Sequence, residues 1–131
     1  MAAQQRPLSP HLQIYRLPLA ARLSILHRAT GVFLSLGAFA LAGWLVAVAS
    51  GEDAYRRFLQ CAGSLPGRLL LLAMIASFVF HTLTGIRHLL WDAGKGLSNP
   101  RVAAGNWIIL VLTVLVTAAL AWLAWAPGAG A

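Results

Sequence analysis

The fold is decided by residues 69–91, which read LLLLAMIASFVFHTLTGIRHLLW. A helix that crosses a bilayer needs about 20 mainly apolar residues, and this run is long enough. Because lipid offers no hydrogen bonds to the backbone, the segment must satisfy its own polar groups as a helix. His81 lies in the middle of it. An imidazole at that depth costs free energy unless something binds it, so His81 is a candidate functional residue.

Two further apolar runs extend over residues 29–50 and 107–125. The chain has 131 residues, of which 60% are hydrophobic and only 10% charged, whereas about a quarter are charged in soluble domains. The sequence therefore predicts an all-α integral membrane bundle of three transmembrane helices, at about 29–50, 69–91 and 107–125, with a short N-terminal surface segment. Residues 1–28 form that segment, 29–126 the anchor domain and 127–131 a tail. The connections are expected to be irregular, and no internal repeat is predicted.

The basic residues indicate a topology rather than a nucleic-acid partner. The net charge is +7, but Lys and Arg gather at the ends of the predicted helices. Seven of them lie before the first helix or around the second connection, and three lie in the first connection. Cytoplasmic loops carry the excess of Lys and Arg, so the N-terminus is predicted to be cytoplasmic and the C-terminus outside.

The chemistry of the second helix centres on one face. Ser77, His81, Gly85 and His88 are spaced by four, four and three residues, so they share that face. Neutral imidazole is a common axial ligand of haem iron, and Gly85 leaves room for a flat macrocycle or a close helix. A C-x-x-C-H motif does not occur, so haem would be held non-covalently. The alternative is that His81 is a hydrogen-bonded packing residue between helices.

A second axial ligand is expected from outside the chain. His88 is two turns from His81, about 10 Å along the helix, so both cannot bind opposite faces of one haem. His27 is predicted to lie too near the start of the first helix to pair with His81. A partner subunit is therefore the simplest source.

The polar residues at the helix edges allow two interpretations. Ser24 and Arg28 are one helical turn apart and project together, so they can hydrogen-bond a quinone carbonyl or a propionate. The alternative makes Ser24 a helix N-cap and Arg28 an interfacial anchor. For Arg87 and Trp91 the spacing favours anchors, with the Arg87 side chain extended to the headgroups.

Two motifs together are similar to a known family. They are Ser-x-x-His-Arg-x-Thr-Gly at residues 24–31 and His-x-x-x-Gly-x-Arg-His at residues 81–88. With Arg-Pro-Leu-Ser-Pro-His-Leu at residues 6–12, the chain resembles the cytochrome b membrane-anchor subunit of succinate dehydrogenase, in its alphaproteobacterial and mitochondrial branch. The resemblance runs from Arg6 through the third helix.

The resemblance implies a complex of four subunits in a lipid bilayer. A flavoprotein subunit oxidises succinate, an iron–sulfur subunit passes the electrons on, and two membrane anchors support ubiquinone reduction. Haem b lies between the anchors, with one histidine from each, which here implies His81. By this resemblance, Ser24 and Arg28 match residues of the family's ubiquinone site. His27 and Arg28 match positions that contact the haem propionates, and His88 matches a histidine near the haem. The implied location is the bacterial inner membrane, or the mitochondrial inner membrane in a eukaryote.

Three alternatives remain open on the sequence. One is a fumarate-reductase-type anchor that uses menaquinol, and another is a structural anchor without haem. A small multidrug-type transporter is a third class, but it needs a carboxylate within the membrane. The first and third predicted helices contain none, and Asp92 lies at an edge.

The predicted topology can be tested with fusions at Ala131. A periplasmic reporter such as alkaline phosphatase is expected to be active there, and a cytoplasmic reporter inactive, because seven basic residues oppose three. A cytoplasmic signal at Ala131 would reverse the orientation.

Overall fold

The computed structural model describes residues 15–126, and these residues form helices without any strand. The helices are α1 (Leu19–Ala49), α2 (Glu52–Gly63), α3 (Leu65–Asp92) and α4 (Asn99–Trp125). Three of them, α1, α3 and α4, are long and apolar enough to cross a bilayer, which confirms the predicted all-α membrane bundle. The predictions for residues 1–14 and 127–131 lie outside the described part of the chain.

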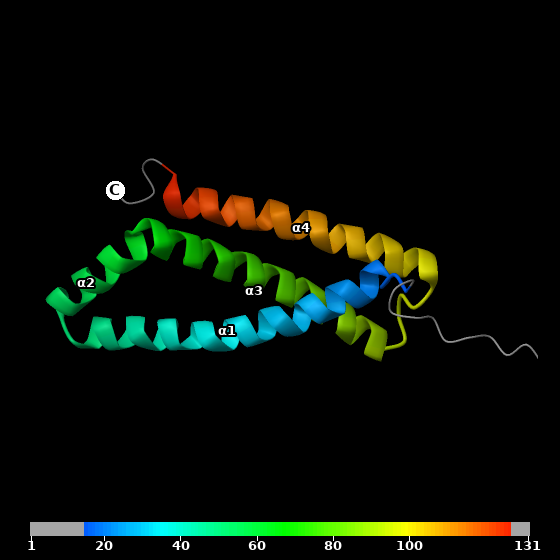
Figure 1. The fold of residues 1–131 in the computed structure, drawn as a ribbon, viewed down its shortest axis with the longest axis horizontal. Helices are drawn as coiled ribbons and strands as arrows, with labels where there is room; N and C mark the ends of the chain where they lie inside the picture. The colour runs from blue at the N-terminus through cyan, green and yellow to red at the C-terminus, as the bar shows by residue number, and fades with distance from the viewer. Residues whose placement is uncertain (1–14, 127–131) are drawn as a thin grey trace, which may run out of the picture.

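The helices α1 and α3 run antiparallel, and α4 returns along α3 (Figure 1). The short α2 joins α1 to α3 at the end of the bundle away from the start of α1 (Figure 1). Because three long helices follow one another, the described part of the chain begins and ends at opposite ends of the bundle.

The long helices begin earlier than hydropathy predicts. The first begins at Leu19 rather than near residue 29, because Pro18 is extended and its carbonyl already accepts hydrogen bonds from Ala21 and Arg22. Residues 19–28 are therefore helical and form the first turns of α1. Hydropathy marks only the apolar part of a helix, whereas backbone hydrogen bonding continues through polar residues at its edge.

Both connections also contain more helix than predicted. In the first connection, α2 places Glu52 and Asp53 in its first turn, where acidic side chains favour a helix, and Glu52 pairs with Arg56. In the second, Pro100 lies in the first turn of α4 and so starts the helix instead of breaking it. Gly94 and Gly96 supply the turn before it, with φ angles of 71° and 75°.

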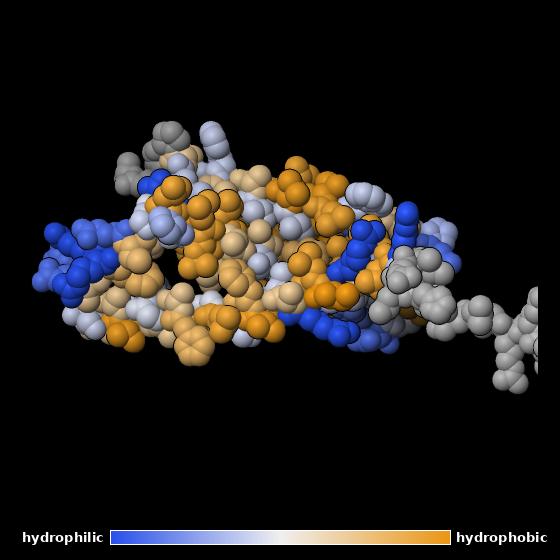
Figure 2. Space-filling model, viewed as in Figure 1, coloured by the Kyte–Doolittle hydropathy of each residue, from blue (hydrophilic) through white to orange (hydrophobic). Residues whose placement is uncertain are grey.

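The interior of the bundle is small. Leu23 of α1, Phe80 of α3 and Ile109 of α4 form the buried cluster, with Leu19, Leu83 and Leu110 packed against it. Most large apolar side chains of the long helices are exposed, and Figure 2 shows them as an apolar surface between two hydrophilic ends. Such a surface fits lipid or a partner subunit and not water.

Candidate functional site

The imidazole of His81 is held by the opposite helix. Its Nδ1 atom lies 3.0 Å from the main-chain carbonyl oxygen of His27 and 3.3 Å from the hydroxyl of Thr30. Because a carbonyl oxygen only accepts hydrogen bonds, Nδ1 carries the proton and donates it. In the neutral ring Nε2 therefore keeps its lone pair. This is the form in which histidine binds iron, with the other ring nitrogen fixed by a hydrogen bond.

His81 also lines an open groove between α1 and α3. The groove has a volume of about 590 Å³. Small side chains of α1 form part of its wall, at Gly31, Ser35, Gly37 and Ala38. A Cβ atom on Gly31 would lie 3.0 Å from Cε1 of His81, so glycine is what allows the ring to rest there.

His27 lies against His81. Their ring centroids are 3.9 Å apart and their planes differ by 11°. The predicted helix start near residue 29 differs from the structure, in which α1 starts at Leu19 and so contains His27 well within the helix. Nδ1 of His27 lies 2.6 Å from the hydroxyl of Thr84, which is fully buried. The ring lies next to Gly85, where an added Cβ would be in ordinary contact at 3.9 Å from Cε1 of His27.

His88 completes a cluster of three histidines. Its ring centroid is 5.1 Å from that of His27 and 5.4 Å from Trp91, whose plane it meets edge-on. His88 thus stands next to His27 rather than next to the groove.

Arg87 is not an exposed anchor, which corrects the sequence-based interpretation. Its side chain is only 6% exposed, donates to Oδ1 of Asn106 on α4, and stacks over Trp91 at 4.6 Å from the ring centroid. The Nε and Nη2 atoms are buried without a partner among the described residues. Arg87 faces α4 because it is one residue before His88, which faces α1, and adjacent residues of a helix point about 100° apart.

Ser24 and Arg28 lie within α1, so Ser24 is not the helix cap. The cap position belongs to Pro18. Ser24 is half-buried and Arg28 exposed, and neither makes a side-chain hydrogen bond among the described residues. By helical spacing they share a face with Gly31 and Ser35, which line the groove. Ser24 is about 10 Å from Gly31 along the helix, at 1.5 Å per residue.

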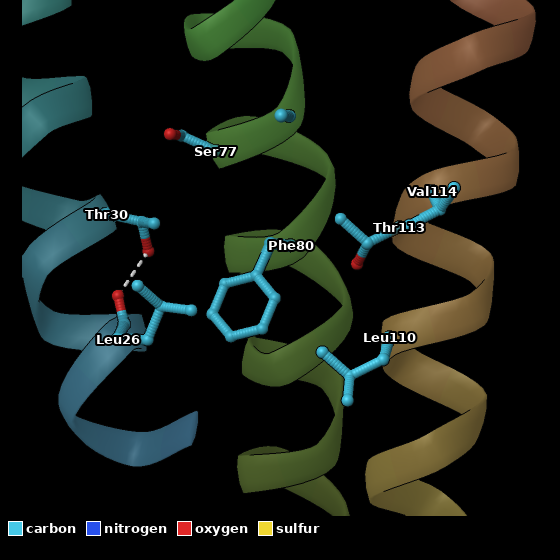
Figure 3. A pocket seen from close by; sticks show the side chains of 8 residues that line it. Leu26, Thr30, Ser77, Phe80, Leu110, Thr113 and Val114 are labelled. Carbon is cyan, nitrogen blue, oxygen red and sulfur yellow. Dashed lines mark hydrogen bonds between the residues drawn. The ribbon is translucent and has the colours of Figure 1, made fainter. Parts of the chain in front are cut away.

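A second pocket, of about 290 Å³, opens where α1, α3 and α4 meet (Figure 3). Phe80 projects into it from α3, between Leu26 and Leu110 (Figure 3). The hydroxyl of Thr30 is bound to its own helix, at Leu26. This pocket therefore offers an apolar surface, and the polar chemistry lies on the side of His81.

The sequence matches known proteins over most of its length. Residues 2–120 match the profile of the succinate dehydrogenase/fumarate reductase transmembrane subunit. The chain belongs to this family. It is 41% identical over 118 residues to the succinate dehydrogenase cytochrome b556 subunit of Paracoccus denitrificans, covering 85% of this chain and 91% of the relative. The b556 subunit of Rickettsia felis is 39% identical over 113 residues, which cover 86% and 88%. The mitochondrial cytochrome b560 subunit of Homo sapiens is 37% identical over 118 residues, which cover 88% and 70%.

This family membership makes the chain a multi-pass membrane subunit of an enzyme complex of the succinate dehydrogenase and fumarate reductase type. Both family-like motifs meet at one place in the structure. Residues 24–31 lie on α1 and residues 81–88 on α3, and the hydrogen bonds of His27 and His81 join them.

The buried Arg87–Asn106 contact yields a prediction for this transmembrane subunit. Asn106→Leu removes the acceptor of a buried guanidinium, which is expected to cost about 1–3 kcal/mol and to lower the melting temperature of the purified complex. Asn99→Leu, an exposed position on the same helix, is the matched control and is expected to melt like wild type. Equal melting temperatures for both variants would show that the contact is not stabilising.

Proposed function

We propose that this chain is the membrane-anchor and electron-transfer subunit of a succinate dehydrogenase. In this proposal it holds haem b through Nε2 of His81 and contributes Ser24 and Arg28 to a ubiquinone-reduction site. The observation that carries the proposal is the hydrogen bond from Nδ1 of His81 to the His27 carbonyl, beside an open groove. It leaves the iron-binding nitrogen free.

The described residues fit one axial bond to haem. The porphyrin supplies four ligands of the iron, so this chain needs to supply only one imidazole. His27 does not suit the opposite position, because its ring is stacked face to face on His81 at 3.9 Å. The other axial ligand is therefore assigned to a second membrane anchor across the open groove. When bound, the haem would act as a reversible one-electron carrier.

The basic side chains near the α1–α3 contact suit a haem, which carries acidic propionates. Three imidazoles and the guanidinium of Arg28 lie on or next to the α1–α3 contact. A propionate there would be paired with the guanidinium of Arg28. His27 would donate to it from Nε2 only as an imidazolium, because Nδ1–H of the neutral ring is bound to Thr84. We assign His27 and Arg28 to the propionates, with His88 behind His27.

The quinone site is proposed at the start of α1. The Ser24 hydroxyl donates a hydrogen bond to a quinone carbonyl, and Arg28 stabilises the negative charge that develops on the oxygen during reduction. This end of the bundle is the cytoplasmic or matrix side in the predicted topology. An iron–sulfur subunit docked here delivers electrons, and a flavoprotein subunit beyond it oxidises succinate.

The direction of the reaction is proposed to be succinate oxidation. The family includes fumarate reductases, but the compared relatives from bacteria and mitochondria are named succinate dehydrogenase subunits. The corresponding locations are the bacterial inner membrane and the mitochondrial inner membrane.

The haem assignment predicts the result of His81→Ala. The purified complex is expected to lose its low-spin ferric haem signal in electron paramagnetic resonance and its reduced b-type absorption band, because the axial nitrogen is gone. His88→Ala is the comparison and is expected to retain both signals. Flavin and iron–sulfur content report whether each complex has assembled. An unchanged bis-histidine signal in His81→Ala would refute the assignment, and a wild-type complex without haem would favour a purely structural anchor.

The quinone assignment predicts a selective loss of quinone reduction. Ser24→Ala removes a hydrogen bond worth about 1–3 kcal/mol, or roughly 5–150-fold in activity at limiting quinone. Arg28→Leu is expected to lose more, because it removes a charge. The measurement is the ratio of succinate–quinone to succinate–dye activity, where the dye accepts electrons upstream of the quinone.

Two variants at the far end of the bundle serve as controls for these measurements. Ser50→Ala removes a hydroxyl that bonds its own helix, and Arg68→Leu removes an exposed arginine. Both are expected to keep the wild-type ratio. A wild-type ratio in Ser24→Ala and Arg28→Leu as well would place the quinone elsewhere.

A further inference from the structure

The helices α1 and α3 carry the same five-residue pattern at the point where they touch. On α1 it is His27-Arg-Ala-Thr-Gly31, and on α3 it is His81-Thr-Leu-Thr-Gly85. We call each of these segments an H-x-x-T-G box. The helices run in opposite directions (Figure 1), so the two boxes meet in a head-to-tail arrangement.

The threonines of the two boxes make equivalent hydrogen bonds. Thr84 donates to its own helix, with Oγ1 at 2.7 Å from the Phe80 carbonyl and 3.1 Å from the His81 carbonyl. Thr30 does the same, at 3.0 Å from Leu26 and 2.9 Å from His27. Each hydroxyl then faces Nδ1 of the histidine in the other box, at 2.6 Å for Thr84 and 3.3 Å for Thr30.

The glycines differ in how tightly the rings lie against them, because a Cβ would be 3.0 Å from the His81 ring at Gly31 but 3.9 Å from the His27 ring at Gly85. The ring of His81 rests on Gly31, and the ring of His27 rests next to Gly85. The two rings stack on each other at 3.9 Å between these glycines. The histidine and threonine of each box thus contact the other box, and His81 in addition bonds the His27 carbonyl.

The hydrogen bonds determine where the protons lie. A hydroxyl has one proton, and the Thr84 hydroxyl donates it to a backbone carbonyl. With its proton in that bond, the hydroxyl accepts a hydrogen bond from Nδ1–H of His27. His81 donates from Nδ1 to a carbonyl in the same way. Both rings are consequently Nδ1–H tautomers in their neutral form, with a lone pair on Nε2.

We infer that the two boxes form a reciprocal clamp, in which Thr84 is a positioning residue for the haem ligand. Thr84 fixes the tautomer and the plane of the His27 ring, and that ring covers one face of His81. The contact of Thr84 is the shorter of the two, and its side chain is fully buried while Thr30 is 8% exposed. We therefore assign the larger effect to Thr84. This inference rests on the proposed ligation of haem by His81.

The clamp can be tested without reference to haem. The complex is labelled with ¹⁵N-histidine, reduced so that a low-spin haem is diamagnetic, and studied by NMR of the ring nitrogens. Wild type and Thr84→Ser are expected to show His27 protonated at Nδ1, because serine keeps the hydroxyl. Thr84→Val, which keeps the shape and removes the hydroxyl, is expected to show a mixture of tautomers. The same His27 tautomer in Thr84→Val as in wild type would overturn the clamp.

A second measurement tests the effect on the ligand. The plane of an axial imidazole affects the g values of low-spin ferric haem, and partners behind a metal ligand typically change metal affinity by about 10–100-fold. Thr84→Val is expected to shift the g values and to release haem about 10-fold faster. This value is at the low end of the range of about 10–100-fold because Thr84 acts on the ligand only through His27. Thr84→Ser is expected to restore wild-type behaviour.

The matched control is Thr113→Val on α4, whose hydroxyl bonds only its own helix at Ile109. It is expected to leave the tautomers, the g values and haem release unchanged. Changed tautomers with unchanged g values and unchanged haem release would refute the positioning role of Thr84. A wild-type complex without haem would refute the proposed ligation, and the NMR result would still decide whether the clamp exists.

Discussion

The bond from Nδ1 of His81 to the carbonyl of His27 is the contact on which the arrangement of the site depends. Two helices must approach closely for it to form, and glycine at residue 31 leaves room for the His81 ring. Within a bilayer an unsatisfied polar group costs several kcal/mol. The two imidazoles therefore stay within the α1–α3 contact only because carbonyl and hydroxyl groups there bind them. The same bonds leave Nε2 of each neutral ring without a proton.

The rest of the bundle is held by few internal apolar contacts. Its buried apolar cluster has one residue from each long helix, whereas large side chains along all three long helices are exposed. Lipid is as apolar as a protein interior, so burial between helices gains little there, and packing and hydrogen bonds decide which faces meet. The Arg87–Asn106 contact has this role between α3 and α4, as the two boxes have between α1 and α3. Polar residues thus specify the arrangement, and apolar ones place it in the membrane.

The proposed quinone site and the proposed haem site lie close together along α1. The face that carries Ser24 and Arg28 continues to Gly31 and Ser35 at the groove. Electrons that reach a quinone at the start of α1 would be within about 10 Å, along the helix, of the groove lined by His81. The helix to which the quinone site is assigned is also the helix whose His27 carbonyl accepts the hydrogen bond of His81.

The sequence by itself determined the helical class, the three spans and the family resemblance. These follow from composition and from motifs that are read along one segment, and the apolar run around His81 needs no knowledge of its neighbours. It also marked Ser24, Arg28, His27, His81 and His88 as candidate site residues. Their roles remain proposals.

Only the tertiary structure decided which of these residues touch. The pairing of His27 with His81 depends on where α1 begins, because each added residue rotates and advances the helix, and hydropathy does not mark that start. The burial of Arg87 depends on the rotation of α3 relative to α4 and on Asn106, which lies 19 residues away. The repeated boxes were present in the sequence, but three shared letters gain meaning only when antiparallel helices place each threonine against the other histidine. Contacts between helices depend on register and rotation, and these are set by the whole bundle rather than by any one segment.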